Sequence, residues 1–331
     1  MTGVYRIFGS EMSPYSVKVR AYARYKQIPH EWIPRRPDNE DEYKRYAKLP
    51  IVPTVATPAG EGLQDSTPII ERLEAEYPEP SIHPDDPALA FLSALIEEFG
   101  DEWGNKLMFH HRWWADVDRD ASAQTLARLS APKASEAEIA QRTAMIRQRM
   151  TGRGYFVGSS EATADLIRAY LNELLDLLEP HLENRRYLFG ARPAFGDFGL
   201  AAQLYETAVD PTGGSIVRSR GPNTLAWCHR MLEPRNDGPF ETWEALEPTL
   251  KPILAYIGRY FLPWTVANAK ALAEGRESFS VELAGQAYVQ PPQKYHAKSL
   301  GVLRARRVAA DDPKLASILA ETGCEPWLRE G

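Results

Sequence analysis

The stretch from Ser10 to Arg20 constrains the fold of this chain more than any other part of the sequence. It follows a short apolar run, residues 4–8, that predicts a strand, so the stretch itself predicts a tight turn and the start of a helix. Pro14 suits the first helical position because its missing N–H would have no partner there, which places Ser13 at the N-cap. The free amides of such a turn attract anions, and the helix dipole lowers the pKa of a thiol held beside them.

An isolated Ser-Pro pair usually does no more than start a helix, because capping residues are common. Two later stretches give this pair its context, LPIVPTV at residues 49–55 and LQDSTPII at residues 63–70. In this order and at this spacing, the three stretches resemble the thioredoxin-like N-terminal domain of the glutathione transferases. The resemblance covers roughly residues 4–232, and the remaining hundred residues form an extension longer than is usual in that family.

The first 80 residues alternate between strand and helix patterns. A four-residue step of Val17, Ala21 and Tyr25 predicts a helix over residues 14–26 with one buried face. Strands are expected at residues 30–33, 52–57 and 62–64, and Ser66 is expected to cap a helix that follows. Residues 38–47 indicate a solvated helix or an irregular loop. This order predicts a small mixed sheet with helices on both faces.

Prolines at 78, 80, 84 and 87 predict a linker, after which the apolar period becomes helical. A long helix is expected from residue 88, with Trp103 and Trp114 on its buried stripe and Glu102 paired with Lys106 one turn later. Further helices are expected at about 136–150, 162–182, 197–209, 223–232 and 248–274. Residues 279–308 give no clear pattern. We therefore expect three parts: a thioredoxin-like α/β domain at 1–80, an all-helical domain at 88–262, and a C-terminal extension at 263–331.

Composition narrows the class of protein. The 331 residues are 44% hydrophobic and 25% charged, and the formal net charge of −6 argues against a nucleic-acid-binding surface. The only cysteines, Cys228 and Cys324, are too far apart for a disulfide framework or a Cys-x-x-Cys site. No ligand set for a metal is visible, since His110 and His111 point about 100° apart on a helix. Without a signal peptide or membrane-span pattern, a cytoplasmic protein that binds no membrane is expected.

The resemblance assigns roles to residues of the N-terminal domain. In the family, the peptide at the position of Val52-Pro53 is cis, and its backbone pairs with the cysteinyl backbone of glutathione. Asp65 and Ser66 fall where family members hold the γ-glutamyl ammonium and carboxylate. The alternative for this pair is an ordinary N-cap, and most family members have Glu or Gln at the position of Asp65.

Several groups compete for the role of thiol activator. Ser13 occupies the position that is Ser in several classes of the family and Cys in thiol-transferring ones. Tyr5, Tyr15 and the backbone amides at the helix start are rival donors. Tyr15, Phe109 and Trp113 are candidates for an apolar cosubstrate pocket between the domains.

A further resemblance concerns the helical part, where Asp197 matches the family's N-capping box, although Ala194 replaces the usual Ser or Thr. Trp227 and Arg230 match the next helix of the family and are expected to be packing residues. Both features are signals for folding rather than for catalysis.

The resemblance implies an enzyme, a glutathione transferase that activates the glutathione thiol for attack on an electrophilic or disulfide cosubstrate. Glutathione-dependent disulfide reduction is implied as a side activity. The expected partners are glutathione, a small hydrophobic electrophile and a second copy of the chain, with no metal cofactor. The alternative is a non-catalytic protein of the same fold that carries a ligand or serves as an interaction module through its long C-terminus.

Overall fold

The structure is a computed structural model, and it describes residues 3–329. Its N-terminal domain contains a four-stranded sheet in the order β2-β1-β3-β4. The strands are β1 (Tyr5–Gly9), β2 (His30–Pro34), β3 (Thr54–Ala56) and β4 (Gly62–Gln64). β1 runs parallel to β2 and antiparallel to β3, with Ile7 opposite both Trp32 and Val55. The mixed sheet that the sequence predicts is therefore present.

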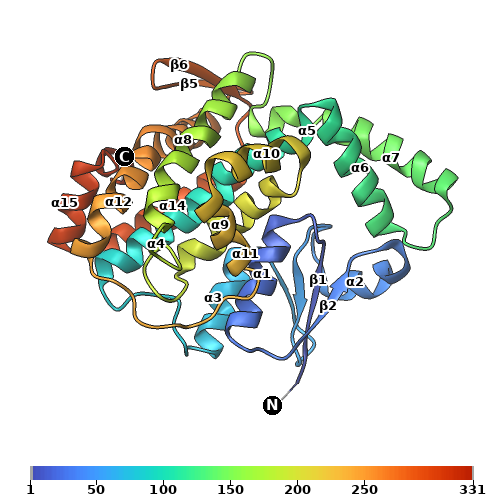
Figure 1. The fold of residues 1–331 in the computed structure, drawn as a ribbon, viewed down its shortest axis with the longest axis horizontal. Helices are drawn as coiled ribbons and strands as arrows, with labels where there is room; N and C mark the ends of the chain where they lie inside the picture. The colour runs from blue at the N-terminus through green and yellow to red at the C-terminus, as the bar shows by residue number, and fades with distance from the viewer. Residues whose placement is uncertain (1–2, 330–331) are drawn as a thin grey trace.

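Helices cover both faces of this sheet. α1 (Pro14–Tyr25) and α3 (Ser66–Glu76) pack in the main core with Ile7 and Val55, on the side of the helical domain (Figure 1). α2 (Glu40–Tyr46) follows the 3₁₀ turn η1 (Pro37–Asn39) and covers the other face, where Phe8 packs against Tyr43. Residues 40–46 thus form a regular helix, because the tyrosines that are scattered through the segment reach the sheet.

The start of α3 corrects one expectation. Ser66 does not cap the helix, because it is already the first helical residue and Asp65 occupies the N-cap position. Asp65 has a positive φ of 76° and makes no side-chain capping bond to α3. Its carboxylate is therefore free to bond elsewhere, and the first amides of α3 lack a side-chain cap.

The second part of the chain is all helical. α4 (Pro87–Phe99), the π-helical turn η2 (Gly100–Gly104) and α5 (Asn105–Trp113) form the long continuous helix that the sequence predicts. A second continuous run combines α12 (Trp243–Tyr256), the π-helical turn η4 (Ile257–Phe261) and α13 (Leu262–Ala273). The other elements are α6 (Asp116–Ser130), α7 (Glu136–Thr151), the 3₁₀ turn η3 (Gly154–Val157), α8 (Ala164–Leu182), α9 (Phe195–Ala208), α10 (Pro211–Arg220) and α11 (Pro222–Arg230). The sequence pattern does not predict α6 or α10.

α9 lies at the centre of the molecule and packs on both α1 and α4. Asp197 in its first turn accepts hydrogen bonds from the amides of Ala194 and Leu188 and from the indole N–H of Trp227, each at 2.8 Å. This confirms Asp197 as a folding signal and Trp227 as a packing residue. Glycines allow the close approach to α4, since a Cβ on Gly199 would lie 2.7 Å from the carbonyl oxygen of Glu97.

Residues 279–329, here called the C-terminal segment, form a hairpin and three helices. These are β5 (Phe279–Leu283), β6 (Gln286–Gln290), α14 (Lys294–Ala309), α15 (Pro313–Glu321) and α16 (Glu325–Leu328). α14 and α15 fold back onto α4, and Figure 1 shows these two red helices near the cyan helix α4. Ion pairs fasten it to the rest of the chain, among them Arg306 with Glu71, Lys314 with Asp86 and Lys251 with Glu321. Among the described residues, the helices are too short or too polar to span a bilayer.

The close contact of α9 with α4 leads to a stability prediction. We expect Gly199→Ala to lower the free energy of unfolding by about 1–3 kcal/mol, because the new methyl group must push two helix backbones apart. Gly301→Ala is the matched control, since Gly301 lies within α14 with open space around it. There Ala should raise stability by about 0.5–1 kcal/mol through helix propensity. Urea unfolding of both variants measures the difference, and equal effects would contradict the packing argument.

Candidate functional site

A cavity of about 790 Å³ lies where the N-terminal domain, the long helix and α14 meet. Its N-terminal wall comes from the loop before β3 and from the turn that starts α3. The opposite wall comes from η2, the start of α5 and the first turns of α14. The lining residues are Tyr15, Arg35, Lys48, Leu49, Pro50, Ile51, Val52, Pro53, Gln64, Asp65, Ser66, Pro68, Glu102, Asn105, Tyr295, His296 and Lys298.

Most of the site residues that the sequence predicts meet in this cavity. Val52, Pro53, Asp65 and Ser66 line it together with Tyr15. The Val52-Pro53 peptide bond is cis, as predicted. Three stretches that are up to 50 residues apart in the sequence therefore contribute to one wall.

Ser13 lies at the N-cap of α1, and its hydroxyl accepts a hydrogen bond from the amide of Ser16 at 3.3 Å. The capping role is confirmed, but Ser13 is not among the residues that line the cavity. Tyr5 is buried in β1, and its hydroxyl donates to Glu76 at 2.7 Å, away from the cavity. The Tyr15 hydroxyl donates to the carbonyl oxygen of Asp101 at 3.0 Å. Burial raises the pKa of Tyr15 well above its ordinary value.

Phe109 and Trp113 lie further along α5 with their ring centroids 6.4 Å apart. Neither residue lines the cavity described here. Their role in a cosubstrate pocket stays a prediction.

A buried charge cluster supports the floor of the site. The Lys18 side chain on α1 is only 1% exposed, and its ammonium pairs with Glu97 on α4 and with Asp101 in η2. The ammonium also donates to the hydroxyl of Thr67 at 3.0 Å. Burial alone would lower the pKa of Lys18, but the two carboxylates raise it above its ordinary value. Lys18 thus remains charged and connects three elements from both domains.

Ser66 is tied to the same cluster. Its hydroxyl donates to Oδ2 of Asp101 at 3.3 Å and accepts from Nζ of Lys18 at 3.4 Å. Asp65 instead faces the cavity, where the hydroxyl of Tyr295 donates to both of its carboxylate oxygens at 3.0 and 2.9 Å. Burial raises the pKa of Asp65, and the bond from Tyr295 opposes this effect.

Glu102 and His296 form a buried pair at the opposite wall. Burial, together with the neighbouring Asp101, raises the pKa of Glu102 to about 8. Burial, with a smaller effect from Lys106, lowers the pKa of His296 to about 3. Burial thus favours the uncharged form of both side chains at neutral pH.

The prediction of an ion pair between Glu102 and Lys106 is wrong. Glu102 lies against His296, while the ammonium of Lys106 donates to Oε1 of Gln290 at 2.5 Å and sits 3.8 Å from the ring centroid of Trp264. The π-helical turn and the C-terminal segment supply these nearer partners, and the spacing of the two residues alone does not reveal them.

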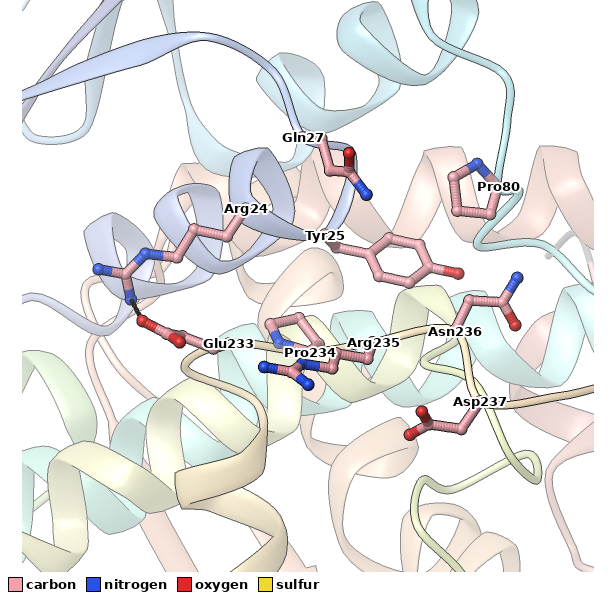
Figure 2. Close-up of a pocket in the computed structure, with 9 residues that line it drawn as sticks. All are labelled: Arg24, Tyr25, Gln27, Pro80, Glu233, Pro234, Arg235, Asn236 and Asp237. Atoms are coloured by element: carbon pink, nitrogen blue, oxygen red, sulfur yellow. Dashed lines mark ion pairs between the residues drawn. The ribbon is translucent and has the colours of Figure 1, made fainter.

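A second cavity of about 580 Å³ lies beside the C-terminal end of α1. Figure 2 shows its lining, which combines Arg24, Tyr25, Gln27 and Pro80 with residues 233–237. Arg24 spans its edge by pairing with Glu233 at 4.0 Å and donating to the carbonyl oxygen of Leu232 at 2.8 Å. The cavity contains none of the predicted site residues, so the 790 Å³ cavity is the candidate functional site.

Two models of protein domains match the chain. Residues 7–81 match the glutathione S-transferase N-terminal domain, and residues 144–230 match the glutathione S-transferase C-terminal domain. No curated protein matches the chain. The chain resembles the glutathione transferase superfamily and has its architecture, a thioredoxin-like α/β domain followed by an all-helical domain.

Several solved structures align with the chain at low identity. A glutathione S-transferase from Methylobacterium radiotolerans, crystallised with glutathione sulfonate, is 21% identical over 72% of this chain and 96% of its own, with a TM-score of 0.41. The beta-etherase LigF from Sphingobium is 20% identical over 76% of this chain and 99% of its own, with a TM-score of 0.48. A glutathione S-transferase from Methylobacillus flagellatus with bound glutathione is 18% identical over 69% of this chain and 95% of its own, with a TM-score of 0.42.

The pair of Glu102 and His296 leads to a pH prediction. Because the carboxyl group of Glu102 keeps its proton up to about pH 8 in the folded chain but loses it near pH 4.5 when unfolded, its contribution to stability falls as pH rises between these values. Gln at this position does not titrate and has nearly the same size and shape as Glu. The free energy of unfolding of Glu102→Gln, relative to the parent, should therefore rise by about 1–2 kcal/mol from pH 6 to pH 8. Urea unfolding at both pH values tests this, and a constant difference would contradict it.

Proposed function

We propose that this chain, which resembles the glutathione transferase superfamily in both of its domains, binds glutathione in the 790 Å³ cavity and activates its thiol. The attacked cosubstrate is an electrophile or a mixed disulfide. The observation that supports this most is the meeting of Val52, Pro53, Asp65 and Ser66 on one wall, next to the start of α1.

The wall offers complementary groups to the ends of a tripeptide. The backbone before Pro53 is suited to pair with the cysteinyl backbone, and the carboxylate of Asp65 accepts from the γ-glutamyl ammonium. The uncapped amides at the start of α3 suit the neighbouring carboxylate. Lys48 lines the same cavity from the loop before β3 and is exposed, so it suits the glycyl carboxylate.

Ser13 is the favoured thiol activator among the three hydroxyl groups. Its oxygen accepts from the amide of Ser16, which leaves its proton available to a thiolate. The hydroxyl protons of Tyr5 and Tyr15 are already donated to Glu76 and to the carbonyl oxygen of Asp101. The backbone amides at the start of α1 remain the rival donors.

The second candidate is a non-catalytic carrier of the same fold. It is favoured by the position of Ser13 outside the cavity lining and by the contact of Tyr295 with Asp65. A carrier would bind ligand without conjugating it. A conjugation assay at saturating glutathione with a model electrophile separates the two functions.

Asp65→Asn tests the proposed ammonium partner. Losing the charge of this carboxylate should weaken glutathione binding by about 5- to 100-fold, the range for one charge-assisted hydrogen bond. Asp85→Asn is the control, because Asp85 is exposed and lies outside the cavity. Isothermal titration calorimetry measures both variants. Equal affinities of Asp65→Asn and the parent would remove Asp65 from the site, and a parent that does not bind glutathione would refute the proposed function.

Ser13→Ala tests thiol activation separately from binding. A hydrogen bond to the thiolate matters more when the sulfur is charged, so conjugation at neutral pH should fall by tens to about a thousandfold while glutathione affinity stays nearly constant. Losing the cap costs about 1 kcal/mol of stability, so circular dichroism must show a folded variant before rates are compared. Full activity in Ser13→Ala, with loss in Tyr15→Phe, would move the role to Tyr15.

The assembly expected for such an enzyme is a homodimer. Sedimentation equilibrium at micromolar concentration should show twice the 37.2 kDa mass of one chain. A species of 37.2 kDa alone would contradict this expectation.

A further inference from the structure

The first turns of α14 form a wall of the candidate site. Tyr295, His296 and Lys298 line the cavity, although they lie 230 or more residues from Asp65 in the sequence. The hydroxyl of Tyr295 donates to the carboxylate of Asp65, so this wall faces the part of the cavity that contains Asp65. It is the part where the proposed function places the amino-acid end of glutathione.

Packed contacts hold this wall in place. Leu300 and Leu303 of α14 are buried, and His296 pairs with Glu102 in the wall of the cavity. At the entry to α14, the side-chain amide of Asn268 donates to the carbonyl oxygen of Gln293 at 2.9 Å and accepts from its backbone amide at 2.7 Å. The side chains on the cavity face of α14 are therefore part of a built site.

The hydroxyl of Ser66 is poorly placed to serve a ligand carboxylate. Ser66 is only 3% exposed, and its hydroxyl is already bonded to Asp101 and Lys18. A ligand carboxylate at the start of α3 can instead accept hydrogen bonds from the first backbone amides of that helix. A cationic side chain beside these amides would stabilise the carboxylate further. Lys18 is fully occupied by Glu97 and Asp101, so this cation must come from another element.

Lys298 meets this requirement. It is exposed, it lines the cavity, and it makes no ion pair with any residue among 3–329. It lies three positions after Tyr295, so both side chains project from the same face of α14. Tyr295 contacts Asp65, and this brings Lys298 close to the N-terminus of α3.

We propose that Lys298 of the C-terminal segment binds the α-carboxylate of a γ-glutamyl group, while the ammonium of the same group donates to the carboxylate of Asp65. This inference rests on the proposed function, because it names a further binding residue of the same site. The carboxylate of Asp65 has room for this ammonium in addition to Tyr295, since an ionised carboxylate offers about four acceptor positions. The cation of Lys298 on α14 and the anion of Asp65 at the start of α3 then match the two opposite charges of the γ-glutamyl group.

Three peptides separate the parts of this recognition. Glutathione carries both charges of the γ-glutamyl end, glutaryl-cysteinylglycine lacks only the ammonium, and 4-aminobutyryl-cysteinylglycine lacks only the α-carboxylate. Their affinities are measured by isothermal titration calorimetry for the parent, for Lys298→Met and for Lys270→Met. Lys270 is the matched control, since it is an exposed lysine on α13 outside the cavity and its loss changes the net charge equally.

Lys298→Met should weaken glutathione and the glutaryl peptide by about 5- to 100-fold and leave the aminobutyryl peptide within about twofold of the parent. Lys270→Met should bind all three like the parent. Unchanged affinities in Lys298→Met, or an equal loss for all three peptides, would overturn the inference while the proposed function stands. A parent that binds none of the peptides would refute the proposed function itself. Lys298→Glu provides a second variant, and it should weaken the two carboxylate-bearing peptides further.

Discussion

The ion cluster of Lys18, Glu97 and Asp101 is the interaction on which the rest of this structure depends. Buried charges cost free energy unless they are paired and hydrogen-bonded, and here the partners come from α1, α4 and η2. The cluster can only form when the N-terminal domain sits on the long helix in one orientation. The same contacts hold Ser66 and Thr67, so the start of α3 is placed by the domain contact as well as by its own sequence. The geometry of the candidate site is thus a product of how the two domains join.

The elements that could be predicted from the sequence are those with strong local signals. Pro14 and the alternating pattern around β1 predict the strand, turn and helix, and the structure confirms them. The hairpin of the C-terminal segment was not predicted because β6 is largely exposed, so few apolar residues mark it. α10 carries Gly213 and Gly214, which argue against a helix. Glycine is needed at both positions because α10 packs closely on the end of α9. A Cβ on Gly213 would lie 2.4 Å from the carbonyl oxygen of Thr207, and a Cβ on Gly214 would lie 2.4 Å from that of Ala208.

Some residues of the candidate site could likewise be predicted from the sequence, and others could not. Val52, Pro53, Asp65 and Ser66 belong to short motifs and could be recognised, whereas Lys298, Tyr295 and His296 lie on a helix whose apolar pattern is weak. Lys18 adjoins Val17 on a helix with a buried face, but a lysine there normally suggests solvent. Only its partners, 79 and 83 residues away, explain its burial. The sequence contains no local signal for such long-range pairs.

The C-terminal segment touches the N-terminal domain through Tyr295 on Asp65 and through Arg306 on Glu71. During synthesis the first domain emerges first, and domains generally fold in that order. The cavity wall that the N-terminal domain supplies can therefore fold before α14, the helix that faces it, has been made. Until then the carboxylate of Asp65 lacks the hydroxyl of Tyr295, which is added to the chain 230 residues later. The cavity is therefore completed much later in synthesis than the domain that supplies its first wall.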